Sequence, residues 1–249
     1  MDAFYGRIGS KKNIVKDIIK VIPKHHIYAE LFVGGGSLFF GIDTSDKKVI
    51  LNDLDRALME GYSMLKNGSI NPADYIMPTT LEDKNELVNK DNLSVEDSII
   101  KRLLISRNTF SSISRGKIYK NYQHHKKLSM IDKYVAKLIP ATLMITDYKD
   151  VIELYDGKHT FFFLDPPYEE SKGLYKDSNI CYISMRDTLS AIKGKFLLTI
   201  NDSKNIQDIF KDFYIKEIEV KGRAYCATDK TSTIGNSIRK ELFITNYII

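Results

Sequence analysis

The sequence predicts an α/β fold built on a mainly parallel β-sheet that is covered by helices on both faces. Short apolar segments of strand length alternate along the chain with segments of helical periodicity. Strands that alternate with helices form parallel sheets with both faces buried. The 249 residues suffice for one large or two modest domains with a full apolar core. With only two cysteines, Cys181 and Cys226, a disulfide framework and a four-cysteine zinc site are excluded.

Seven strands are expected because seven short apolar or alternating runs are bounded by polar residues, glycine or proline. They cover residues 27–33, 49–51, 143–146, 160–164, 195–200, 213–220 and 241–248. The run at 160–164 is the most apolar. In the last two runs apolar and polar residues alternate, as expected of two strands that close the sheet. Helical periodicity predicts helices over 10–21, 54–66, 96–106 and 203–212.

Residues 61–139 interrupt this alternation and are interpreted as an insertion of helices and loops, which leaves 1–60 and 140–249 as the main domain. Positive charge is concentrated in the insertion. In a chain with a net charge of +5, residues 101–137 contain ten Lys or Arg and one acid, Asp132. Such a segment is typical of proteins that bind a polyanion. A solvated, lysine-rich helix face would have the same composition and remains the alternative.

No stretch of the sequence approaches the roughly 20 consecutive apolar residues of a membrane-spanning helix. The first residues, Met1 to Phe4, lack the basic and then apolar pattern of a signal peptide. We therefore expect no membrane association and a cytoplasmic location, in a bacterium or in the host cell of a phage or other virus.

Two strand ends indicate a cofactor site, since ligands of parallel sheets bind beyond the carboxyl ends of the strands. The strand at 27–33 runs into Gly34-Gly35-Gly36, where glycines allow a tight turn and close approach of a ligand. Asp53 ends the next strand and is typical of an acid that binds the ribose of a nucleoside-like cofactor. The turn lacks the Gly-x-Gly-x-x-Gly pattern, which disfavours a dinucleotide. A glycine-rich turn without a ligand is the alternative.

A third strand end, Asp165-Pro166-Pro167-Tyr168, carries the most specific signal. The two prolines lack N–H donors and fix φ, so the chain after the strand is stiff. The Asp165 carboxylate and the Pro166 carbonyl are both acceptors, which suits an exocyclic amine with two N–H bonds to donate. Tyr168 offers a flat face for a base to stack on. An ordinary Pro-Pro turn is the alternative, and the flanking Asp and Tyr disfavour it.

With these motifs the chain resembles the Dam-like DNA adenine-N6 methyltransferases, which use S-adenosylmethionine, over most of its length. The matching segments, in the family's order, are Arg7 to Lys11, Glu30 to Gly36, Asn52-Asp53, Asp165 to Tyr168, Thr199 to Ser203 and Glu241 to Tyr247. Arg7 stands where many members have an aromatic residue, and Leu31 where they usually have proline. The segment from Arg107 to Lys117 does not clearly match members that read GATC.

The resemblance implies a seven-stranded, Rossmann-like methyltransferase sheet, with 61–139 as the target-recognition insertion. An adenine rotated out of the duplex would stack on Tyr168, while Asp165 and the Pro166 carbonyl hold its amino group. The implied cofactor residues are Arg7, Lys11, Glu30, Phe32, Gly34, Gly36, Asp53, Asp147, Tyr148 and Asp165. The implied DNA-binding residues are Arg107, Asn108, Arg115, Lys117, Lys126 and Lys127. No metal is implied.

The motifs also leave several alternatives to DNA adenine methylation. RNA adenine methylation is the nearest alternative, because the residues that would bind the base do not distinguish RNA from DNA. A DNA-binding protein that has lost catalysis is disfavoured by the intact Asp165 and Tyr168, and a nicotinamide dehydrogenase by the missing phosphate-loop pattern. Cytosine-N4 and protein glutamine methylation are disfavoured because their usual tetrapeptides begin with Ser and Asn. The expected partner is double-stranded DNA, a cognate restriction endonuclease is a further candidate, and a monomer or weak dimer is expected.

Overall fold

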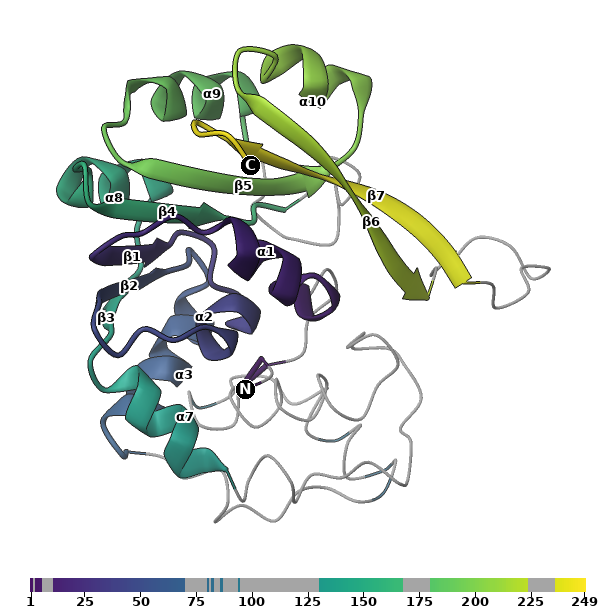
Figure 1. The fold of residues 1–249 in the computed structure, drawn as a ribbon. Coiled ribbons are helices and arrows are strands. Elements are labelled where there is room, and N and C mark those ends of the chain that lie inside the picture. Colours follow the sequence, from purple (N-terminus) through teal and green to yellow (C-terminus); the bar gives the residue numbers. More distant parts are fainter. Residues whose placement is uncertain are drawn as a thin grey trace. The chain divides into compact units, whose positions relative to one another are not determined.

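A computed structural model of the chain describes residues 1, 3–5, 11–69, 80, 82, 86, 94, 130–167, 180–223 and 236–249. The strands of these ranges form a seven-stranded sheet in the order β3-β2-β1-β4-β5-β7-β6 (Figure 1). β1 with β4, β2 with β3 and β4 with β5 pair in parallel, whereas β7 is antiparallel to both β5 and β6. A mixed, mainly parallel α/β sheet is therefore confirmed.

Each of the seven expected strands is present. Their bounds are β1 (Ile27–Glu30), β2 (Lys48–Asn52), β3 (Thr142–Met144), β4 (Thr160–Leu164), β5 (Lys195–Asn201), β6 (Tyr214–Arg223) and β7 (Asn236–Thr245). β1 ends three residues before the expected Val33, because the chain leaves the sheet there to enter the glycine turn. β6 and β7 extend to Arg223 and back to Asn236, beyond the bounds 213–220 and 241–248 that the sequence predicts for the two closing strands around a polar hairpin.

The helices are less well anticipated by the sequence. Their bounds are a 3-10 turn (Lys11–Asn13), α1 (Val15–Val21), α2 (Ser37–Gly41), α3 (Arg56–Lys66), α7 (Ile131–Leu138), α8 (Tyr148–Tyr155), α9 (Tyr182–Ala191) and α10 (Lys204–Ile209). α3 begins at Arg56 because the Asp55 side chain caps it by accepting from the Leu58 N–H. Ser203 caps α10 in the same way through the Ile206 N–H. The expected helix at 96–106 lies outside the described residues.

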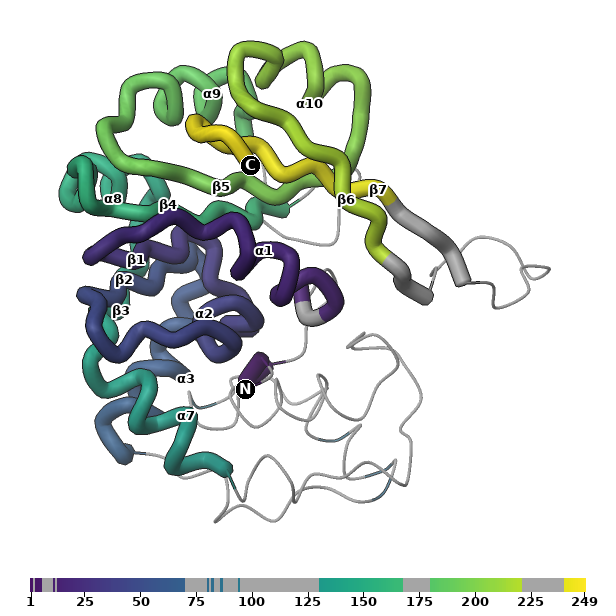
Figure 2. Tube along the Cα trace, in the orientation of Figure 1, coloured from purple at the N-terminus to yellow at the C-terminus, as the bar shows by residue number. Residues whose placement is uncertain are grey.

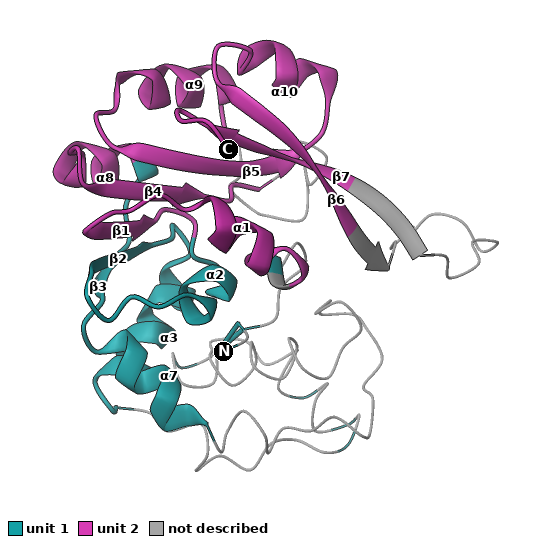
Figure 3. Cartoon of the chain, in the orientation of Figure 1, with its two compact units in different colours: residues 1–12, 33–148 teal, residues 13–32, 149–249 magenta. Residues whose placement is uncertain are grey.

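The chain divides into two compact units, of which unit 1 comprises residues 1–12 and 33–148 (teal in Figure 3). Within it β2 and β3 pair in parallel, from Ile50 opposite Thr142 to Asn52 opposite Met144. An aromatic cluster forms much of its core. Phe4 and Phe40 each pack edge-on against Tyr134, with ring centroids 5.2 and 4.9 Å apart. Tyr5 contacts Tyr62 at 5.3 Å, so the N-terminal residues are part of this core.

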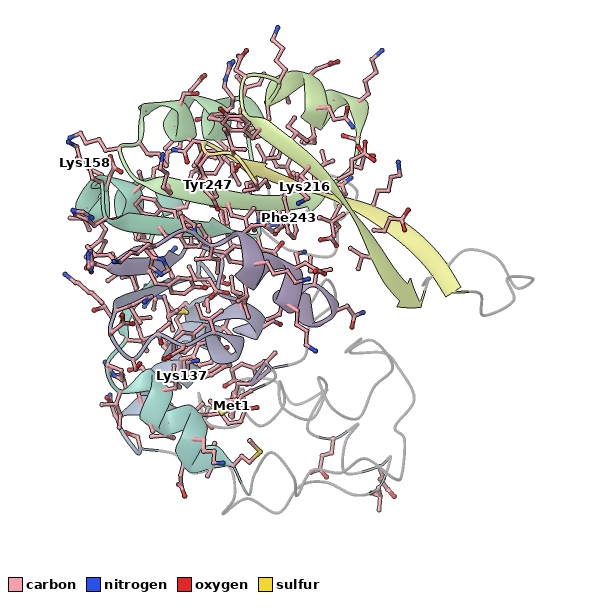
Figure 4. The ribbon with its side chains drawn as sticks, in the orientation of Figure 1. Met1, Lys137, Lys158, Lys216, Phe243 and Tyr247 are labelled. Atoms are coloured by element: carbon pink, nitrogen blue, oxygen red, sulfur yellow. The ribbon has the colours of Figure 1, made fainter. Side chains whose placement is uncertain are left out.

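Two cations hold the end of α2, the short helix that follows the glycine turn. The Met1 ammonium donates to the Phe40 carbonyl at 2.8 Å, and the Lys137 ammonium donates to the carbonyl of Ile42 (Figure 4). The Lys137 Nζ also lies 5.2 Å from the centroid of the Phe39 ring. Carbonyls at the end of a helix have no partner within it, and a cation satisfies them well.

Unit 2 comprises residues 13–32 and 149–249 and contains β1, β4, β5, β7 and β6 (magenta in Figure 3). All five residues of β4 are buried, as expected for a strand covered on both faces. β1 and β5 flank it in parallel, with Glu30 opposite Phe163 and Leu198 opposite Leu164. The Tyr247 hydroxyl, near the C-terminus, donates to the carbonyl of Val21 in α1 at 2.9 Å.

The β6–β7 pair forms a ribbon that continues past β5. Residues 241–245 of β7 pair with β5 on one side and with β6 on the other. Residues 236–240 pair with β6 and have no counterpart in the β5 register of the described residues. Figures 1 and 2 show β6 and β7 running side by side.

Candidate active site

The glycine turn and Asp53 meet in unit 1. β2 places Asp53 directly after its last residue, and the Gly34 N–H donates to its Oδ2 at 2.9 Å. The Asp55 N–H donates to the other carboxylate oxygen, Oδ1, at 3.0 Å. Asp53 therefore connects the end of β2 to the glycine turn and to the entry of α3, besides its expected role toward a cofactor.

Further hydrogen bonds shape the turn itself. The Val33 N–H donates to the Asn52 carbonyl at 2.9 Å, and the Gly36 N–H donates to the Val33 carbonyl at 2.7 Å. The Tyr62 hydroxyl, on α3, donates to the Gly34 carbonyl at 2.9 Å. The turn is thus held by residues from two neighbouring elements, so its backbone is preorganised.

The structure gives a different reason for the glycines than ligand access alone. Gly34 and Gly36 have φ values of 48° and 70°, a region that L side chains rarely adopt. A Cβ on Gly35 would lie 2.1 Å from the Tyr5 carbonyl oxygen, and one on Gly36 would lie 2.7 Å from the Phe40 ring. The space beside Gly35 and Gly36 is therefore taken by the protein's own atoms.

In unit 2 the Asp-Pro-Pro turn begins where β4 ends. Asp165 is half-buried and Pro166 is buried. The Thr199 hydroxyl, from β5, donates to Oδ1 of Asp165 at 3.0 Å. At the other end of the turn, the Tyr182 hydroxyl of α9 donates to the Pro167 carbonyl at 2.8 Å. Both ends of this three-residue segment are therefore anchored by side chains distant in sequence.

Glu30 ends β1, the strand next to β4. Its side chain is 2% exposed, and the fully buried Tyr28 donates its hydroxyl to Oε2 at 2.6 Å. Burial, followed by the charge of Glu30 and the hydrogen bond to it, raises the pKa of Tyr28 well above its usual value. The phenol therefore remains a hydrogen-bond donor to Glu30. By register, Glu30 and Asp165 lie at the carboxyl ends of neighbouring strands.

The other expected cofactor residues are placed as follows. Lys11 is buried in the 3-10 turn, and Phe32 is half-buried after β1. Asp147 is exposed just before α8, whereas Tyr148 begins that helix and is buried. Arg7, Tyr168 and the six expected DNA-binding residues, Arg107, Asn108, Arg115, Lys117, Lys126 and Lys127, lie outside the described residues.

Sequence reasoning missed four hydroxyls that orient the expected residues. They are Tyr28 on Glu30, Tyr62 on Gly34, Tyr182 on Pro167 and Thr199 on Asp165. Thr199 carried a signal that could have been noticed, because it is a hydroxyl within the otherwise apolar run Phe196 to Ile200. A buried hydroxyl requires a hydrogen-bond partner. The tyrosines carried no comparable signal among the chain's 15 tyrosines.

Comparison with known proteins identifies the family. The family profile described as "D12 class N6 adenine-specific DNA methyltransferase" matches residues 8–96 and 97–223. The chain belongs to this class. The methyltransferase acts on the N6 amino group of adenine in DNA and uses S-adenosylmethionine as methyl donor. The family and cofactor that the motifs predicted are therefore confirmed.

Three curated relatives align with nearly the whole methyltransferase. M1.LlaDCHI, a Type II methyltransferase of Lactococcus lactis subsp. cremoris, is 24% identical, and the alignment covers 96% of this chain and 93% of the relative. M.MjaIII of Methanocaldococcus jannaschii is 22% identical with 96% of each chain covered. M.CviBI of Paramecium bursaria Chlorella virus NC1A is also 22% identical, with 96% and 97% covered. Both are named Type II methyltransferases.

The chemistry of two acceptors, the carboxylates of Asp53 and Glu30, fits S-adenosylmethionine. Asp53 presents a carboxylate at the end of β2, and carboxylate oxygens accept from the hydroxyls of a ribose. Glu30 presents a buried carboxylate at the end of β1, and a buried carboxylate is stabilised by a cation such as an amino acid's ammonium. Within the described ranges no cluster of three or more His, Cys, Asp or Glu could hold a metal ion. None of the helices described there has the length and hydropathy to span a bilayer.

Proposed function

We propose that the methyltransferase modifies adenine N6 in double-stranded DNA with Asp165, Pro166 and Tyr168 as the residues that hold the target base. The observation that carries this proposal is the Asp165 carboxylate at the end of β4, where Thr199 donates to one of its oxygens. It is an oriented acceptor next to a second acceptor, the carbonyl of the buried Pro166.

The bound cofactor supplies an electrophilic methyl group on a sulfonium sulfur. The Asp165 carboxylate and the Pro166 carbonyl accept the two N–H bonds of the adenine amino group, so the nitrogen lone pair is directed at that methyl group. On accepting that methyl group the nitrogen would become positively charged, and it would then lose a proton to water. The carboxylate stabilises this developing charge. Tyr168 stacks on the extruded base.

We further assign the cofactor to the residues that the family motifs imply. Asp53 binds its ribose, Glu30 and Phe32 face its methionine end together with the turn at Gly34 and Gly36, and Arg7 and Lys11 lie beside it. Asp147 and Tyr148 contact its adenine. The support is the position of Glu30 and Asp53 at strand ends, the match of the other residues to the family motifs and the fit of the two carboxylates.

DNA recognition is assigned to residues 61–139, including Arg107, Asn108, Arg115, Lys117, Lys126 and Lys127. The support is the excess of ten basic residues over one acid in 101–137. Because the relatives are named Type II methyltransferases, we propose that this enzyme protects DNA against a restriction endonuclease of the same specificity. It would act as a monomer or weak dimer in the cytoplasm, where its DNA substrate lies.

The test is Asp165→Ala, measured with single-turnover methyl transfer on double-stranded DNA. The variant is expected to fold, to bind DNA and to lose methyl transfer by at least ~100-fold, the scale of one preorganised electrostatic contact. Asp208→Ala, which removes an exposed carboxylate of α10, is the matched control and should keep full activity. A folded Asp165→Ala enzyme with normal transfer would leave the tetrapeptide as an ordinary proline turn.

A further inference from the structure

We propose that Thr199 is a positioning residue for methyl transfer. Its hydroxyl orients the Asp165 carboxylate toward the target amine. The inference rests on the function proposed above for Asp165. It goes beyond the tetrapeptide, because Thr199 lies 34 residues further along the chain, on a different strand.

The sheet register places the two residues together. β4 and β5 are parallel and pair up to Leu164 opposite Leu198, so the next residues, Asp165 and Thr199, are neighbours at the point where β4 has ended. The Thr199 Oγ1 lies 3.0 Å from the Asp165 Oδ1 and 3.4 Å from the Leu164 carbonyl oxygen. The shorter contact, to the charged acceptor, is the stronger one.

The environment of Thr199 explains why its hydroxyl has a defined direction. The residue is 0% exposed, and so are its chain neighbours Leu198 and Ile200 and its Cα partner Phe243 on β7. A hydroxyl in such an apolar layer must be hydrogen-bonded. Threonine is β-branched and therefore restricted at χ1, and it sits on a strand paired on both sides. The donor is thus carried by a strand that neighbouring strands hold on both sides.

Asp165 needs such support, because it follows the last residue of β4 and the sheet ladder does not include it. The Tyr182 hydroxyl holds the Pro167 carbonyl at the other end of the same turn. The acceptors of Asp165 and Pro166 therefore lie in a segment anchored on both sides. Small misplacements of a reacting group are costly in rate, so a lost anchor on the carboxylate should reduce turnover more than it reduces binding.

The experiment compares Thr199→Val and Thr199→Ser in the full chain. Valine keeps the shape and the χ1 restriction but removes the donor. We expect kcat to fall by about tenfold or more, while the affinities for DNA and S-adenosylmethionine stay within about twofold. Serine keeps the donor and should retain most of the wild-type kcat. Thr188→Val is the matched control, since it removes a threonine hydroxyl that donates to the Ser184 carbonyl within α9.

A double variant separates this inference from the proposed function. If Thr199 acts through Asp165, then adding Thr199→Val to the Asp165→Ala variant should lower kcat little further. An active Asp165→Ala enzyme would overturn the proposed function. An inactive Asp165→Ala enzyme together with an unchanged kcat in folded Thr199→Val would overturn only the role of Thr199.

Two further outcomes would also overturn the role proposed for Thr199. Equal losses in Thr199→Ser and Thr199→Val would indicate packing, and a rise in KM at constant kcat would indicate binding. Circular dichroism and thermal melting check that each variant is folded. If Thr199→Val does not fold, Thr199→Cys takes its place, because a thiol is only a weak donor. It is expected to lose kcat as well, and a wild-type kcat in that variant would overturn the inference.

Discussion

Replacing Asp53 by alanine should weaken S-adenosylmethionine binding and destabilise the glycine turn together, because one carboxylate serves both. Its two oxygens accept from the Gly34 N–H at 2.9 Å and from the Asp55 N–H at 3.0 Å. Hydrogen bonds to a charged group contribute roughly 1.5–3 kcal/mol each. Two bonds at the low end give about 3 kcal/mol; because Asp53 is only half-buried, we discount this for solvent screening and expect a loss of about 2–3 kcal/mol. For a chain of this size that lowers the Tm by about 5–10 °C.

The cofactor affinity should fall by more than about tenfold, or about 1.4 kcal/mol, since the ribose loses its acceptor. Calorimetric titration with S-adenosylmethionine measures this directly. Thermal melting with and without cofactor gives an independent value, because a ligand at free concentration L that binds only the folded state stabilises it by RT ln(1 + L/Kd) and so raises the Tm.

Asp55→Ala is the matched control, two residues further along the chain. It removes the N-cap of α3, where Asp55 accepts from the Leu58 N–H at 3.2 Å, and should cost about 1 kcal/mol without changing cofactor affinity. A folded Asp53→Ala variant with unchanged affinity would remove Asp53 from the cofactor site. An unchanged Tm would refute the argument that Asp53 stabilises the turn.

Three further predictions concern DNA, the base and pH. Neutralising Lys126 and Lys127 together should flatten the dependence of DNA affinity on salt by about two phosphate contacts. Neutralising Lys193 and Lys195 is the control and should leave that dependence unchanged. An unchanged slope in the first variant would mean that Lys126 and Lys127 face solvent. Tyr168→Phe keeps the stacking face and should retain substantial methyl transfer, whereas Tyr168→Ala should lose it; equal losses would refute stacking as its role. The pKa of Tyr28 is raised in the folded state, so its protonated phenol contributes stability that is fully present below the unfolded-state pKa near 10. This contribution is lost as the pH rises toward the folded-state pKa. The free energy of unfolding, measured with urea between pH 9 and 11, should therefore decline less steeply with pH in Tyr28→Phe than in wild type or in the exposed-site control Tyr214→Phe. Equal slopes would contradict this role of Tyr28.

The sequence by itself determined the strands, their fold class and the position of the chemistry along the chain. β4 was recognisable because a strand buried on both faces must be apolar throughout, and Asp165-Pro166-Pro167 follows it immediately. Asp53 was identifiable for the same reason, since β2 is a short apolar run that ends beside it. These features are local, so burial and backbone preference leave them readable in consecutive residues.

Tertiary structure alone decided what holds those residues in place. The Thr199 hydroxyl reaches Asp165 across 34 residues of sequence, and the Gly34 N–H reaches Asp53 across 19. The glycines show the same limit, because the need for Gly35 arises from the Tyr5 carbonyl, a main-chain atom of a distant segment. Such contacts depend on strand register and on which segments become neighbours on folding. A lone hydroxyl in an apolar run, such as Thr199, indicates that a partner exists but does not say which one. The partners that orient the candidate site therefore become visible only once the chain has folded.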